Sequence, residues 1–106
     1  DSISSDENLK MNIRDVKNPL QKVENLRGVS FEWMSTHLSD WGVIAQELEQ
    51  TLPHLVSKNK NIRVANYQGI LAYNLEATKK LYQQQKEMDN ELQQLERDLE
   101  QLRLKQ

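Results

Sequence analysis

The 106-residue chain contains no cysteine, which excludes disulfide bonds and thiolate metal sites. Its three glycines are too few for the loops that cradle phosphates in nucleotide-binding proteins. The net charge of −2 lacks the excess of lysine and arginine that binding to nucleic acids or anionic membranes requires. No apolar run approaches the roughly 18 residues of a transmembrane helix, and no signal-like segment opens the chain. We therefore expect neither a nucleic-acid partner nor a membrane partner.

The histidines and paired glutamates predict neither a metal site nor a catalytic site. His37 and His54 are the only imidazoles, and they lie far apart with no carboxylate at ligand spacing. We expect both on the surface or in loops, and we expect no metal, no cofactor and no histidine-dependent triad. Glu47 and Glu49 stand two apart on a predicted helix and so point in different directions, which favours a solvated face over glycoside chemistry. The basic cluster at residues 58–63 is typical of a solvated turn.

Three regions differ in pattern. Residues 1–17 have few apolar positions and predict an extended or turn-rich arm that carries the candidate site. Residues 18–67 predict a small globular head, and residues 68–106 predict a long helix. The chain is 37% hydrophobic and 28% charged, which is lean for an isolated globule. Oligomerisation is therefore the expected source of stability.

The head is predicted to be α+β. Asn18 followed by Pro19 is typical of a helix start. Residues 29–33 alternate between apolar and polar, which is the pattern of a half-buried strand. The expected order is a helix at 19–26 that Gly28 stops, a strand at 29–33, a polar connection at 35–40, a helix at 44–52 that Pro53 ends, and a strand at 62–67. We expect the two strands to pair in one small antiparallel sheet, and Trp33 and Trp41 to be core or interface aromatics.

The last helix carries a heptad pattern, which predicts a left-handed coiled coil. Its apolar positions follow one another at alternating steps of four and three residues. This seam consists of Leu81, Gln85, Met88, Leu92, Leu95, Leu99 and Leu102. Gln85, Leu92 and Leu99 take the a positions, where no β-branched residue favours a parallel dimer, and Gln85 is a polar core residue that fixes register. Spacing alone leaves dimer, trimer and tetramer open, as well as a hairpin within one chain or a solvated helix with incidental leucines.

The hexad Ser5-Asp6-Glu7-Asn8-Leu9-Lys10 places a hydroxyl and an amine five residues apart. A Ser–Lys pair can cut a peptide bond when a neutral lysine accepts the hydroxyl proton. In the plainer interpretation, Ser5 caps a short helical turn. A straight strand places the two side chains on opposite faces, and a regular helix places them about 140° apart. They can therefore meet only if residues 6–8 turn, or if the lysine comes from another chain.

The hexad overlaps or precedes four further segments. In chain order they are Leu9–Ile13, Leu26–Trp33, the run Gly42-Val43-Ile44-Ala45-Gln46-Glu47-Leu48, and Val64–Tyr67. In this order the sequence resembles the self-cleaving intramolecular chaperone domain at the C-terminal ends of phage tail fibres, tailspikes and endosialidases, which has a relative in myelin regulatory factor. The resemblance implies that Ser5 is the nucleophile and that Lys10 is the general base. We then expect the Ser4–Ser5 bond to be the cleavage site, because an N-to-O acyl shift moves the preceding carbonyl, that of Ser4, onto the Ser5 hydroxyl.

The same resemblance implies a homotrimer, with the last helix in a parallel trimeric coiled coil. Such a domain would register three chains, assist the folding of the upstream fibre stalk of the same precursor, and release itself by one autoproteolytic turnover. It would act in the cytoplasm of the infected bacterial host during virion assembly and be removed from the mature fibre. Two alternatives remain: a purely structural trimerisation module without catalysis, and a shed fragment of a membrane-anchored transcription factor, which no transmembrane or basic segment supports.

Overall fold

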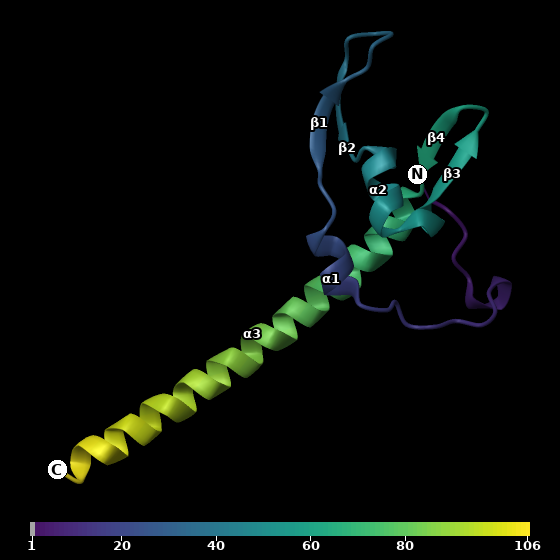
Figure 1. Cartoon of the computed structure of the whole chain (residues 1–106). Coiled ribbons are helices and arrows are strands. Elements are labelled where there is room, and N and C mark those ends of the chain that lie inside the picture. Colours follow the sequence, from purple (N-terminus) through teal and green to yellow (C-terminus); the bar gives the residue numbers. More distant parts are fainter. Residues whose placement is uncertain (1) are drawn as a thin grey trace.

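A computed structural model describes residues 2–106 of the chain. The molecule is elongated, with extents of 74 × 40 × 26 Å. Figure 1 shows the short elements gathered at one end of a single long helix that runs away from them to the C-terminus. Within the described residues, no helix has the length and apolar character needed to cross a membrane.

The elements confirm the predicted α+β class, with short helices and small antiparallel sheets followed by a long C-terminal helix. The helices are α1 (Pro19–Glu24), α2 (Ala45–Thr51) and α3 (Tyr67–Leu104); the strands are β1 (Val29–Glu32), β2 (Ser39–Gly42), β3 (Val56–Asn59) and β4 (Ile62–Ala65); two 3₁₀ turns are η1 (Glu7–Leu9) and η2 (Pro53–Leu55). The predicted helices and the two predicted strands lie within a few residues of these bounds.

The strand pairing differs from the prediction. β1 pairs with β2, and β3 pairs with β4, so the described chain has two separate antiparallel hairpins. The predicted pairing of the strands at 29–33 and 62–67 is therefore wrong. Ser39 and Asp40, predicted in a polar connection, instead begin β2 opposite Glu32 and Phe31. The chain can reverse quickly here because His37 takes a left-handed φ of 60°, and a near partner in sequence costs the least loop entropy.

The core of the head consists of three leucines. Leu48, Leu52 and Leu55 are buried where α2 meets η2. Leu26, Val43, Val56, Ala65, Ile70 and Tyr73 pack around them. Gly69 brings α3 close to this core, because a Cβ at that position would collide with the Leu55 side chain. The head is therefore fastened to the first turns of α3.

Both tryptophans lie outside this core. Trp33 is 51% exposed and Trp41 is 73% exposed, so neither is a core residue of the single chain. Both histidines are exposed, as predicted. His37 lies in the turn between β1 and β2, and His54 Nε2 lies 3.0 Å from the Tyr73 hydroxyl.

Two ion pairs tie α2 to its surroundings. Arg27 donates to both carboxylate oxygens of Glu47 at 3.0 and 2.6 Å, and Arg63 donates to Glu49 at 2.8 Å. The hydrogen bonding from Arg27 lowers the pKa of Glu47. Each of the two carboxylates is half-buried and has a basic partner of its own, so the two are not paired with each other for glycoside chemistry.

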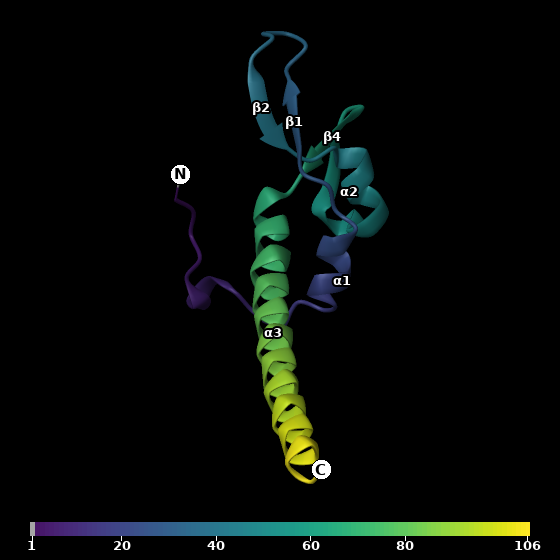
Figure 2. The same cartoon turned by 90° about the vertical axis from the view of Figure 1, so that its left-hand side faces the viewer.

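The N-terminal arm, residues 2–17 as described, is separate from the head. α1 packs on the N-terminal half of α3, beside Glu76, Lys80 and Gln84. Figure 2 shows most of the arm on the opposite side of α3 from α1 and α2, while its end, at Asp15 and Val16, lies against α3 beside Glu76 and Lys79. Its backbone is irregular except for η1.

Candidate functional site

The hexad forms a tight turn that Asp6 caps. The Asp6 carboxylate accepts a hydrogen bond from the Asn8 backbone N–H at 2.9 Å. The N–H groups of Leu9 and Lys10 donate to the carbonyls of Asp6 and Glu7 at 3.0 and 3.1 Å. The plainer interpretation of the hexad, with Ser5 as the cap, is therefore wrong: Asp6 satisfies the turn and leaves the Ser5 hydroxyl free of that task.

This turn brings the two ends of the hexad together. Lys10 Nζ donates a hydrogen bond to Ser5 Oγ at 2.6 Å. The turn that the contact requires is present over residues 6–8, and a single chain forms the contact without a lysine from a neighbour. Both side chains are exposed. Within residues 2–106 no carboxylate lies at ion-pair distance from Lys10.

A Ser–Lys contact supplies one of the two conditions for peptide-bond cleavage. The hydroxyl and the amine are within proton-transfer distance, so the geometry is suited to general-base activation of Ser5. The second condition is a neutral lysine, which desolvation favours and water opposes. The single chain does not bury this site. Any catalysis therefore depends on a surface that covers the turn.

The predicted coiled-coil seam runs along α3, and no described residue of the chain covers it. Its six apolar residues are each between 54% and 63% exposed, and Gln85 donates to Asp89 at 3.2 Å. The six are Leu81, Met88, Leu92, Leu95, Leu99 and Leu102. An apolar stripe of this length is typical of a helix that packs against other helices.

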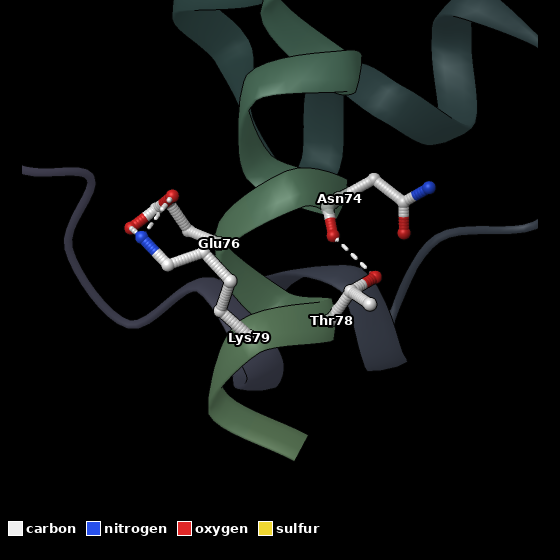
Figure 3. Close-up of polar contacts among 4 residues, drawn as sticks. All are labelled: Asn74, Glu76, Thr78 and Lys79. Carbon is white, nitrogen blue, oxygen red and sulfur yellow. Dashed lines mark hydrogen bonds and ion pairs between the residues drawn. The ribbon is translucent and has the colours of Figure 1, made fainter. Parts of the chain in front are cut away.

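The heptad phase of the predicted seam continues from Leu81 toward the head, where its first two positions are polar. Counting back in the same phase gives Thr78 at a, Asn74 at d, Leu71 at a and Tyr67 at d. Figure 3 shows Asn74 and Thr78 on one side of α3, and Glu76 and Lys79 on another.

Hydrogen bonds within α3 satisfy part of this polar stretch. The Thr78 hydroxyl donates to the Asn74 carbonyl at 2.8 Å, so it needs no partner from outside the helix. Away from the seam, Glu76 and Lys79 form an ion pair at 3.3 Å. The heptad positions of Asn74 and Thr78 can be counted from the sequence. A search for apolar residues alone misses them because both side chains are polar.

Comparison with known proteins places the sequence in a family. Residues 5–57 match the family model described as the chaperone of endosialidase, which is also named as a peptidase family. Similar relatives are the long tail fiber proteins Gp37 of Enterobacteria phages K3 and T2. Each is 34% identical over 100 residues, which cover 85% of this chain. The chain spans about 8% of the length of these relatives. The matched range holds both ends of the hexad and the leucine core, and the chain belongs to the chaperone of endosialidase family.

Proposed function

We propose that the chain is the trimerisation chaperone of a phage tail fibre or related fibrous protein, and that Ser5 and Lys10 release it by autoproteolysis. The 2.6 Å contact between Lys10 Nζ and Ser5 Oγ carries this proposal, because it lies within the segment that matches the family. The open seam of α3 supports the assembly part. Three copies would join along it, bring three upstream stalks into register and promote the folding of those stalks.

The cleavage step uses only protein groups and water. Neutral Lys10 takes the proton of the Ser5 hydroxyl while Oγ attacks the carbonyl carbon of Ser4. A C–O bond forms, the C–N bond between Ser4 and Ser5 breaks, and the proton passes from Lys10 to the Ser5 nitrogen. Water then hydrolyses the ester, which leaves a carboxylate on Ser4 and restores the Ser5 hydroxyl. Each chain is cut once.

Assembly would switch this chemistry on. Lys10 is exposed in the single chain, where water favours the charged amine that cannot accept a proton. When three chains and the upstream stalk come together, they can exclude water from the turn. Cleavage would then follow correct assembly, in the cytoplasm of the infected bacterial host, and would remove the chaperone from the mature fibre. The tail fibre relatives support this setting.

The decisive experiment uses a precursor extended upstream by its native stalk. We expect Lys10→Arg to yield only full-length chain on a denaturing gel, because a guanidinium keeps the charge but does not lose its proton in proteins. Ser5→Ala should also stay uncut while it still forms trimers. Lys17→Arg, on the same arm but outside the hexad, is the matched control and should cleave like wild type. Normal cleavage of the Lys10→Arg chain would show that Lys10 is not the base.

Mixed trimers test whether the dyad lies within one chain. Because the Ser5–Lys10 contact forms inside a single chain, a mixture of Ser5→Ala and Lys10→Ala chains should remain uncut. Cleavage of the Lys10→Ala chains in this mixture would instead show that a neighbour supplies the lysine.

The exposure of Ser5 and Lys10 favours one alternative, a structural trimerisation module without chemistry. The same gel separates the two functions. A wild-type precursor that assembles fully into trimers and stays uncut would support the structural module, whereas first-order cleavage that is independent of added protease or chelator would support the chaperone with autoproteolysis.

A further inference from the structure

An apolar hollow lies in the head between its two hairpins and the start of α3. It encloses about 490 Å³, within the range of roughly 300–1,000 Å³ found for binding pockets. Its apolar walls include Phe31, Trp33, Ile44, Ile62, Val64 and Tyr67. Ile62 is 69% exposed and Tyr67 is 52% exposed. Among the described residues that line the hollow, one side chain is charged, that of Arg63, and it forms an ion pair with Glu49. The hollow therefore suits an uncharged, apolar occupant.

The N-terminal arm carries a matching row of apolar side chains. Leu9, Met11 and Ile13 alternate with polar residues and are 74%, 82% and 74% exposed. No described residue of the arm lines the hollow of its own chain. The arm and the hollow are thus two uncovered apolar surfaces, and the arm carries the Ser5–Lys10 turn beside its row.

The arm stands on the side of α3 where a neighbouring chain would pack. α1 lies against Glu76, Lys80 and Gln84, which take heptad positions f, c and g, on the side of α3 away from the a and d seam. Most of the arm is on the opposite side of α3 from α1 (Figure 2). The hollow also borders the seam, because Tyr67 is a d position two heptads before Leu81.

The arm is long enough to make this connection. Pro19 lies beside Lys80, which is 13 residues from Tyr67, or about 20 Å along the helix. Packed helices add about 10 Å between axes, and about 10 Å more separates α1 from the axis of its own α3, because α1 lies on the side away from the seam. The ten residues from Leu9 to Pro19 span up to about 33–36 Å when extended, which exceeds the combined distance of about 28 Å, and the eight residues from Met11 just reach it.

We propose that Leu9 and Met11 of one chain occupy the apolar hollow in the head of a neighbouring copy. The proposal rests on the proposed function, since it needs chains that associate through the α3 seam. Docking would hold the Ser5–Lys10 turn against the neighbour and shield it from water. It would also explain how assembly covers a dyad that one chain forms but leaves exposed.

Cysteine crosslinking tests this directly, because the chain has no cysteine of its own. Met11→Cys chains and longer, tagged Val64→Cys chains are refolded together, oxidised and separated on a non-reducing gel. We expect a disulfide-linked dimer of mixed size. Lys58→Cys is the matched control: it lies on the same hairpin, is exposed and does not line the hollow. Replacing Val64→Cys with Lys58→Cys should abolish the mixed dimer.

Sedimentation of the same samples distinguishes failure of the docking proposal alone from failure of the assembly on which it rests. Trimers without the mixed dimer would overturn the docking proposal and leave the chaperone proposal standing. A disulfide that forms only when both cysteines are in one chain would overturn it too, because the arm would then fill its own hollow. Crosslinking of Val64→Cys to a cysteine in the upstream stalk, in place of Met11→Cys, would identify the stalk as the occupant and overturn it. Monomers would overturn the assembly on which both proposals depend.

Discussion

The head and the C-terminal part of α3 obtain their stability in different ways. The head closes a core of Leu48, Leu52 and Leu55 within one chain. Beyond Ala77, every residue of α3 is exposed, including a regular stripe of leucines. A long helix with an unburied apolar stripe depends on packing against other helices, because helix propensity alone contributes little stability. The head is therefore specified by contacts within the chain, whereas the C-terminal part of α3 relies on contacts that the proposed trimer would supply.

The strongest test of this difference removes the contacts between chains. Leu92→Asp combined with Leu95→Asp places charges at adjacent a and d positions, where burial without a partner is costly. We expect complete loss of the trimer in sedimentation equilibrium and a marked loss of helical circular dichroism, while the head keeps its fold.

A control on the far face of the same helix gives this result its meaning. Gln93→Asp adds the same charge at position b, outside the seam, and should leave the trimer intact. A wild-type chain that is monomeric at micromolar concentration would contradict the assembly model altogether.

The converse test removes a contact within the head. Leu48→Ala deletes most of a side chain that is 1% exposed, and large-to-small changes of this kind cost about 2–5 kcal/mol. We expect the head of this variant to unfold at a lower temperature than that of wild type while the α3 trimer is still present. Tryptophan fluorescence measures the unfolding of the head. Leu38→Ala, at a site 66% exposed, is the control and should have little effect. Simultaneous loss of head and trimer would show that the two regions fold as one unit.

The sequence predicted elements with a clear period and missed those without one. The α3 heptad and the alternating residues of β1 identify themselves. β2 begins with Ser39 and Asp40, and β3 is polar after Val56, so neither strand shows alternation of apolar and polar residues. Because these two strands were not predicted, β1 was wrongly expected to pair with β4. Short hairpins of this kind are set by the turns that join their strands, such as the left-handed His37, and not by the pattern of the strands.

At the candidate site, the condition for the Ser5–Lys10 contact could be predicted from the sequence, whereas its geometry is seen only in the structure. Strand and helix periods showed that Ser5 and Lys10 could meet only through a turn. They could not show that Asp6 would cap this turn and leave Ser5 free. The sequence also could not show that Lys10 is exposed in the single chain. Whether assembly buries Lys10 depends on contacts between chains, which the pattern of one sequence does not reveal. The catalytic role itself stays a prediction until the Lys10→Arg precursor is tested.

A smaller effect is expected at the one polar residue predicted within the leucine seam. Gln85 is exposed in the single chain, and Gln85→Leu replaces an amide that the proposed trimer would bury. Removal of a buried polar group that is imperfectly paired can stabilise by about 1 kcal/mol, or about 4–8 °C in melting temperature for a domain of 60–100 residues. We also expect a mixture of registers or oligomers in sedimentation, because a polar core residue fixes register. Gln83→Leu, at position f, is the control; equal melting of both variants and wild type would place Gln85 outside the seam.

The smallest effect concerns the acid sensitivity of the head. Arg27 lowers the pKa of Glu47 from its usual value of 4.5, chiefly through their hydrogen bonds. A carboxylate with a lowered pKa in the folded state stabilises that state above its unfolded pKa, and the contribution disappears as pH falls through the folded value. Wild type should therefore lose stability relative to Glu47→Gln as pH falls from 7 to about 3, by a small amount because the pair is solvent-exposed. Thermal melts at both pH values measure it. Glu24→Gln, which removes an exposed carboxylate outside this pair, should keep the wild-type pH dependence, and the same dependence in Glu47→Gln would show that the Arg27 pair contributes nothing to the head.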